Sequence, residues 1–145
     1  MIDLDNQTDL PIDLDSLEKI ASYLSSREVE LIIVDNETMK SLNLEHRNID
    51  SSTDVLSFPL ETPFTEQSIF DIPLGSVIIS DSHVRDKSKR FSHTIQDELS
   101  LLFIHGVLHL LGFDHETDTG EMRDREASII RTFDLPKSLI IRTGE

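Results

Sequence analysis

The sequence contains no cysteine and few basic residues. The absence of cysteine excludes disulfide bonds and zinc sites built from thiolates, and it is compatible with a reducing cytosol. Thirteen lysines and arginines stand against 28 aspartates and glutamates, which gives a net charge of −15. Because this charge repels polyanions, binding of a nucleic acid requires a local basic surface.

Long apolar runs are also absent. No segment approaches the roughly 20 apolar residues of a membrane-spanning helix. The N-terminus, Met-Ile-Asp-Leu-Asp, lacks the basic and apolar regions of a signal peptide. We therefore expect a cytoplasmic protein with no membrane partner, and the 145 residues predict a single domain, 1–145.

The spacing of apolar residues predicts an alternation of helices and strands. Helices are expected at 13–25, 37–46, 81–90, 94–111 and 119–133, and strands at 29–34, 53–58 and 76–80, with an edge strand within 1–8. Asp13, Asn36 and Thr94 are the expected N-caps of the first, second and fourth helices. Such alternation is typical of an α/β fold, here a mixed sheet of about four strands with packed helices. Strands 53–58 and 76–80 are joined without a helix, so we expect them to pair antiparallel.

Three histidines and a glycine form the most informative motif. His105 and His109 are four residues apart on a helix, so both imidazoles can point at one metal ion. His115 lies too far along the axis to join them from the same straight helix. Gly112 can adopt the left-handed conformation that ends a helix, which would return His115 to the same metal. Three neutral imidazoles that leave one coordination position open are typical of a catalytic zinc site.

Two histidines with this spacing, taken alone, are more often surface residues or hydrogen-bonded core residues than metal ligands. Here they interrupt a strongly apolar helix that contains Leu102, Ile104 and Leu108. Burying two imidazoles there without partners would cost on the order of 2 kcal/mol each. The added glycine and third histidine therefore favour a metal. The remaining histidines lack this spacing, and we expect them to be exposed: His46, His83 and His93.

Gly106 stands where zinc peptidases of the His-Glu-x-x-His type carry their catalytic glutamate. The glycine either leaves space above the metal for a bulky substrate or allows close packing of the helix on the sheet. In both cases the general base of a peptidase is missing. Asp114 is a candidate for orienting a metal-bound imidazole. Glu116 and Asp118 are candidates for accepting a proton, and all three carboxylates also fit an ordinary acidic turn.

Positive charge gathers in one expected helix. Arg85, Lys87, Lys89 and Arg90 form a basic cluster that could contact a phosphate backbone, although charge on a helix usually marks only a solvated face. Arg47 stands alone at the end of another expected helix. Its guanidinium could bind phosphate through two parallel hydrogen bonds, or it could merely interact with the helix dipole.

Residues 105–115, with the sequence His-Gly-Val-Leu-His-Leu-Leu-Gly-Phe-Asp-His, resemble the signature of the YbeY family of bacterial endoribonucleases, which are rRNA maturation factors. Residues 41–47 followed by 52–59 are similar to the family's segment with Leu-Asn, Arg and Thr-Asp-Val-Leu-Ser-Phe-Pro. Residues 74–80 are similar to its Gly-Asp-Ile-Val-Ile-Ser strand, except that Ser76 stands where the family commonly has aspartate.

The resemblance implies a small α/β fold with one zinc ion per chain, bound by His105, His109 and His115. It also implies that Arg47, which matches the family's functional arginine, acts with these histidines in the cleavage of single-stranded RNA. The implied role is 16S rRNA 3′-end maturation and 70S ribosome quality control, with ribosomal RNA and the ribosome as partners. Two other functions stay open: a zinc metallopeptidase, and a ribosome-associated assembly factor without catalytic activity.

Overall fold

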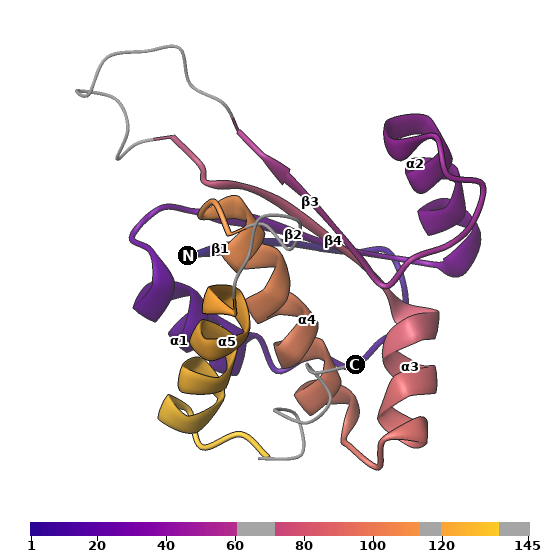
Figure 1. Cartoon of the computed structure of the whole chain (residues 1–145). Coiled ribbons are helices and arrows are strands. Elements are labelled where there is room, and N and C mark those ends of the chain that lie inside the picture. Colours follow the sequence, from indigo (N-terminus) through magenta and orange to yellow (C-terminus); the bar gives the residue numbers. More distant parts are fainter. Residues whose placement is uncertain (61–71, 114–119, 137–145) are drawn as a thin grey trace.

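The computed structural model describes residues 1–60, 72–113 and 120–136. Within these ranges, four strands form one sheet and five helices pack around it (Figure 1). The elements in chain order are β1 (Ile2–Asn6), α1 (Leu14–Leu24), β2 (Val29–Val34), α2 (Asn36–Arg47), β3 (Val55–Pro59), β4 (Gly75–Ser80), α3 (Asp81–Arg90), α4 (Ile95–Leu110) and α5 (Glu121–Thr132). None of the helices in the described ranges is long and apolar enough to cross a membrane.

The sheet is mixed, with the strand order β1-β2-β4-β3. Strands β1, β2 and β4 are parallel, and Leu31 of β2 pairs with Val77 of β4. Strand β3 lies antiparallel to β4 at one edge, with Ser57 opposite Val77. The predicted α/β class, the four-stranded mixed sheet and the antiparallel pairing of its last two strands are thereby confirmed.

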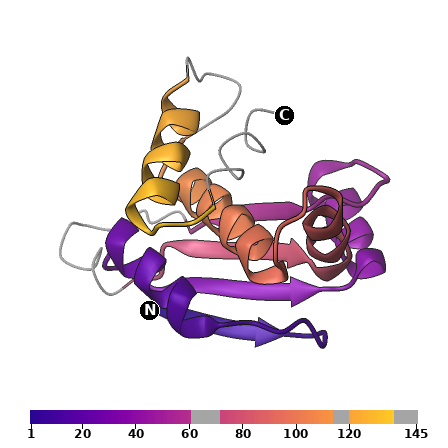
Figure 2. The same ribbon diagram turned by 90° about the horizontal axis from the view of Figure 1, so that it is seen from below.

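One face of the sheet carries most of the hydrophobic core. Helices α1, α3 and α4 pack on this face, with α4 at its centre, and α5 packs against α4 (Figures 1 and 2). Helix α4 is apolar around most of its circumference, as expected of a buried helix. Its fully buried side chains include Leu99, Phe103, Ile104 and Leu108. The first two histidines of the motif, His105 and His109, are therefore carried by a helix that is anchored in the main core.

The opposite face is covered by α2 alone among the described helices (Figure 1). Its contact with the sheet forms a separate smaller core, made of Val34, Met39, Leu56 and Ile78. Alternate residues of β3 and β4 point to opposite faces, because side chains alternate along a strand. Ile78 therefore faces the smaller core, while Val77 and Ile79 belong to the larger one.

Two of the three predicted helix N-caps are confirmed. The N–H of Ser16 donates to Asp13, and the N–H of Asp97 donates to the hydroxyl of Thr94. The third was wrong by one position. Asp35 caps α2 by accepting from the N–H of Thr38 at 2.8 Å, and Asn36 is the first helical residue. Aspartate and asparagine are both favoured N-caps, so the residue type alone does not decide between two adjacent candidates.

Candidate metal and phosphate site

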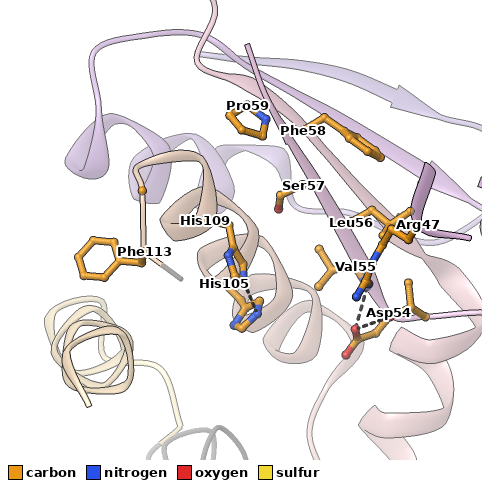
Figure 3. A pocket seen from close by; sticks show the side chains of 12 residues that line it. Arg47, Asp54, Val55, Leu56, Ser57, Phe58, Pro59, His105, His109 and Phe113 are labelled. Atoms are coloured by element: carbon orange, nitrogen blue, oxygen red, sulfur yellow. Dashed lines mark hydrogen bonds between the residues drawn. The ribbon is translucent and has the colours of Figure 1, made fainter. Parts of the chain in front are cut away.

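His105 and His109 project from consecutive turns of α4 into one cavity, where their rings meet edge to face (Figure 3). Their Nε2 atoms lie 3.2 Å apart, and the ring planes are inclined by 73°. Two ring nitrogens this close repel each other unless a proton or a cation lies between them. In a tetrahedral zinc site with Zn–N bonds of about 2.05 Å, two ligand nitrogens are about 3.3 Å apart. The imidazole pair therefore has the spacing that two ligands of one zinc ion need.

The other ring nitrogen of His105 contacts a carboxylate from a different helix. Nδ1 of His105 lies 2.7 Å from Oε1 of Glu126, a residue of α5 that is only 3% exposed. Because a carboxylate accepts hydrogen bonds and does not donate them, the proton of a neutral His105 belongs on Nδ1. The lone pair of Nε2 is then available to a metal. The sequence predicts Asp114 for such a contact. It does not mark Glu126, because Glu126 is 21 residues from His105 and belongs to no motif that contains it.

Two of the three predicted metal ligands are among the described residues. His115 lies outside them, as do Asp114, Glu116 and Asp118. Within the described part of the chain, no group of three or more metal-binding side chains comes together. The third ligand therefore stays a prediction from the motif. The structure itself shows two imidazoles with converging Nε2 atoms.

Gly112 ends α4 in the predicted left-handed conformation, with φ of +103°. Its N–H donates to the carbonyl of His109 at 3.0 Å, and the N–H of Phe113 donates to the carbonyl of Leu108 at 3.1 Å. Such bonds satisfy the last carbonyls of a helix and turn the chain off its axis. The turn thus follows directly after the second histidine, as a third ligand from the next segment would require.

The cavity at the imidazole pair has a volume of about 600 Å³ and is walled by β3, the end of α4 and the end of α2. Arg47 is the last residue of α2, which reaches the cavity from the face of the sheet opposite α4 (Figure 1). Asn48 ends that helix in the left-handed region with φ of 56°. The structure thus brings Arg47 to the same cavity as His105 and His109, although 58 positions separate it from the nearer histidine in the sequence.

Asp54 is a cavity residue that the sequence did not single out for chemistry. Its side chain and that of Arg47 point toward one another (Figure 3). Lys87 of α3 donates to Asp54 at 2.9 Å. Burial alone would raise the pKa of Asp54, but the hydrogen bond and charge of Lys87 lower it. The charge of His105 and the N–H of Val55 act in the same direction, so the pKa lies below its usual range. Asp54 is therefore a fixed negative charge at the cavity wall.

The structure decides between the two interpretations of Gly106. A Cβ built on this residue would lie 2.6 Å from Cγ1 of Val77 and 3.2 Å from the hydroxyl of Ser57. The hydroxyl of Ser57 also donates to the carbonyl of Gly106 at 3.0 Å. The glycine faces the sheet rather than the space above the imidazoles. Close packing of α4 on β3 and β4 is therefore the reason for a glycine at this position.

We predict that Gly106→Ala destabilises the protein. Overpacking of a tight core costs about 1–3 kcal/mol, and the gain in helix propensity from glycine to alanine recovers only about 1 kcal/mol. In a Val77→Ala background the clashing methyl groups are gone, so the same substitution should become neutral or stabilising. Urea unfolding of the two single variants, the double variant and the parent measures this coupling. If Gly106→Ala kept its stability but lost activity, the result would instead favour the interpretation that the glycine leaves space for the substrate.

The basic cluster is partly neutralised by carboxylates. Arg85 pairs with Asp9 at 2.9 Å, and Lys87 pairs with Asp54 at the same distance. The guanidinium of Arg90 lies 5.4 Å from the ring centre of Phe91. A phosphate backbone would therefore compete with existing ion pairs at the first two residues, which weakens the case for this cluster as the RNA contact.

The expected exposure of the other histidines was wrong for His93. Its side chain is 2% exposed, and Nδ1 lies 3.8 Å from Oε1 of Glu98, which is fully buried at the start of α4. His83 is partly buried, and its Nδ1 lies 3.1 Å from the hydroxyl of Ser80. His46 is exposed as expected, although its ring lies 4.9 Å from that of Phe58. The described residues that line the cavity of the imidazole pair do not include any of these three histidines.

The departure from the family pattern at Ser76 lies away from this cavity. The side chain of Ser76 is on the opposite face of β4 from Val77 and donates to Oε1 of Glu30 on β2 at 2.7 Å. It is therefore part of the sheet surface on the side of α2.

The fold and the paired imidazoles first define a class, that of small α/β proteins with a candidate metal site on the central helix. The solution structure of TM1509 from Thermotoga maritima has a similar fold, with a TM-score of 0.59 and 27% identity over 92% of this chain and 89% of that chain. A family model described as endoribonuclease YbeY matches residues 7–134. The chain therefore belongs to the endoribonuclease YbeY family, a family of hydrolases that cleave phosphodiester bonds in RNA.

Individual relatives agree with this assignment along almost the whole chain. The endoribonuclease YbeY of Sulfurovum sp. (strain NBC37-1) is 65% identical over 98% of this chain and 97% of its own length. That of Sulfurimonas denitrificans is 54% identical over 99% of both. The family expected from the three motifs is thereby confirmed.

Proposed function

We propose that the protein is a zinc-dependent endoribonuclease that cleaves single-stranded RNA in the cytoplasm. Its role in this proposal is 16S rRNA 3′-end maturation and 70S ribosome quality control, with the ribosome as partner and residues 1–145 as one catalytic domain. The observation that carries the proposal is the meeting of Arg47 with the imidazoles of His105 and His109 in one cavity. A cation site beside a guanidinium suits a reaction at phosphate, since both offset negative charge.

Zinc would be held by His105, His109 and His115, one ion per chain. When bound, zinc supplies a Lewis acid beside the scissile phosphate and makes water a usable nucleophile near neutral pH. The Nε2 lone pairs of the first two histidines fit this ion, because they converge at 3.2 Å. A site with three neutral ligands leaves room for substrate at the remaining position.

The side chains around the imidazoles would then orient the RNA. Arg47 would bind the phosphate through two parallel N–H···O bonds and offset the charge that develops in the transition state. Asp54 is placed to orient the guanidinium toward the cavity, since the two side chains point toward one another (Figure 3). Its lowered pKa makes Asp54 a weak proton acceptor. We therefore assign it to positioning and not to general base catalysis.

The two alternative functions make different demands. A zinc peptidase needs a carboxylate where Gly106 stands, and that glycine packs against Val77. An assembly factor without catalytic activity does not need a guanidinium at the metal. The geometry therefore favours the nuclease over both.

The decisive experiment compares substrates with and without a metal chelator. Purified protein loaded with zinc should cleave single-stranded RNA, cleave structured RNA more slowly, and lose this activity when the chelator removes the metal. An unstructured peptide should stay intact under the same conditions. Peptide cleavage that the chelator blocks, with RNA left intact, would establish the peptidase. A protein that binds ribosomes but cleaves neither substrate would establish the assembly factor.

A further inference from the structure

Glu126 occupies an unusual place in its helix. Helix α5 presents Met122, Ile129 and Ile130 to the core at helical spacing, and all three are fully buried. Glu126 lies between them on the same face, one turn after Met122, and is itself 3% exposed. A leucine would suit this position better on grounds of packing alone, because a carboxylate is costly to bury unless it is paired. Packing in the core therefore does not explain why a glutamate occupies this position.

The partner of the carboxylate supplies that reason. Glu126 Oε1 lies 2.7 Å from Nδ1 of His105, the short distance of a charge-assisted hydrogen bond. This bond fixes two properties of the ring at once. It places the proton on Nδ1, and it prevents the ring from turning over, so that Nε2 stays directed at Nε2 of His109.

We propose that Glu126 is the positioning residue of the metal site, holding His105 as the Nδ1–H tautomer with Nε2 directed at the metal. This inference rests on the proposed metal site and adds α5 to the elements that build it. The carboxylate would also offset part of the charge that a divalent cation brings into the site. Glu126 does not touch the substrate in this assignment; it acts through His105.

The test uses Glu126→Ala, which removes the hydrogen-bond acceptor, and Glu126→Gln, which keeps an acceptor oxygen and removes the charge. Glu121→Ala and Glu121→Gln are matched controls, because Glu121 is an exposed glutamate on the same helix. Zinc affinity is measured by competition with a chromogenic chelator, without RNA. We expect Glu126→Ala to bind zinc about 10–100-fold more weakly than the parent, with Glu126→Gln between the two. Both Glu121 variants should bind like the parent.

A second measurement uses metal-free protein and does not depend on zinc. Nitrogen-15 NMR of the imidazoles should show His105 as the Nδ1–H tautomer in the parent and in Glu126→Gln, and loss of this preference in Glu126→Ala. A merely structural glutamate would lower the unfolding temperature of the variants but leave the tautomer and the zinc affinity unchanged. In Glu126→Gln, which is the variant closest in shape, a zinc affinity equal to that of the parent would overturn the proposal even if Glu126→Ala did not fold.

The two measurements also separate this inference from the proposed function. A parent protein that binds no zinc would contradict the proposed function. In that case the role of Glu126 is tested by the tautomer of His105 alone. If Glu126→Ala retained the Nδ1–H tautomer, the proposed positioning role of Glu126 would be overturned.

Discussion

Replacing His109 by alanine should remove the metal and abolish RNA cleavage. The variant keeps His105 and the predicted ligand His115, but two imidazoles hold a zinc ion far more weakly than three. Metal content should fall from about one zinc per chain to almost none, as measured by elemental analysis after dialysis. Because a catalytic metal contributes several kcal/mol to transition-state stabilisation, cleavage of single-stranded RNA should fall by about a thousand-fold or more.

The same variant should lose the stabilisation that zinc gives to the parent. At a free zinc concentration of about a thousand times Kd, a ligand that binds only the folded state adds about 4 kcal/mol to the free energy of unfolding. The unfolding temperature of the parent should therefore rise on addition of zinc, and that of His109→Ala should not. His83→Ala is the control, because His83 lies outside the cavity and contacts Ser80. Full zinc occupancy in His109→Ala would show that His109 is not a ligand and would contradict the proposed metal site.

Replacing Arg47 by alanine should leave the metal in place and lower RNA cleavage about 10²–10³-fold, the usual effect of removing one donor that stabilises transition-state charge. Arg47 is exposed at the end of α2 and outside both hydrophobic cores, so the free energy of unfolding should change little. Arg47→Lys should recover little activity, because lysine keeps the charge but lacks the planar pair of donors. Single-turnover cleavage of a labelled RNA measures all three proteins.

Arg131 offers a matched control for the Arg47 variants. It is also an exposed arginine in the last turn of a helix, but it lies on α5 and away from the cavity. If arginine at a helix end acts only on the helix dipole, both alanine variants should lose the same few tenths of a kcal/mol of stability and neither should lose activity. Equal activity of Arg47→Ala and Arg131→Ala would therefore contradict the proposed role of Arg47.

The parts of the structure that follow local rules could be predicted from the sequence. The helices and strands follow from apolar spacing, and the imidazole pair follows from two histidines one helical turn apart. The turn at Gly112 follows from the conformational freedom of glycine. Even the mixed sheet follows from the two adjacent strands without a helix between them. These features depend on residues that are close in the sequence.

The features that could not be predicted depend on residues that are distant in the sequence. Glu126 reaches His105 across 21 positions, and Lys87 reaches Asp54 across 33. Nothing in the local pattern marks either carboxylate, since glutamate in a helix and aspartate before a strand are ordinary. The burial of His93 has the same origin: its surroundings are set by the packing of α4 and not by its neighbours in the chain. Tertiary packing thus determines which carboxylates contact the cavity, whereas the local pattern of the sequence marks the candidate ligands.

The smaller core beneath α2 has a consequence for how such a protein can diverge. The guanidinium that would contact the RNA is carried by α2, which rests on Val34, Met39, Leu56 and Ile78. His105 and His109, two of the three proposed metal ligands, are carried by α4, which rests on the larger core across the sheet. The side chains that support α2 are therefore distinct from those that support α4, although both cores use strand β4. Substitutions on the exposed side of α2 can therefore alter the surface around Arg47 while the imidazole pair on α4 keeps its packing.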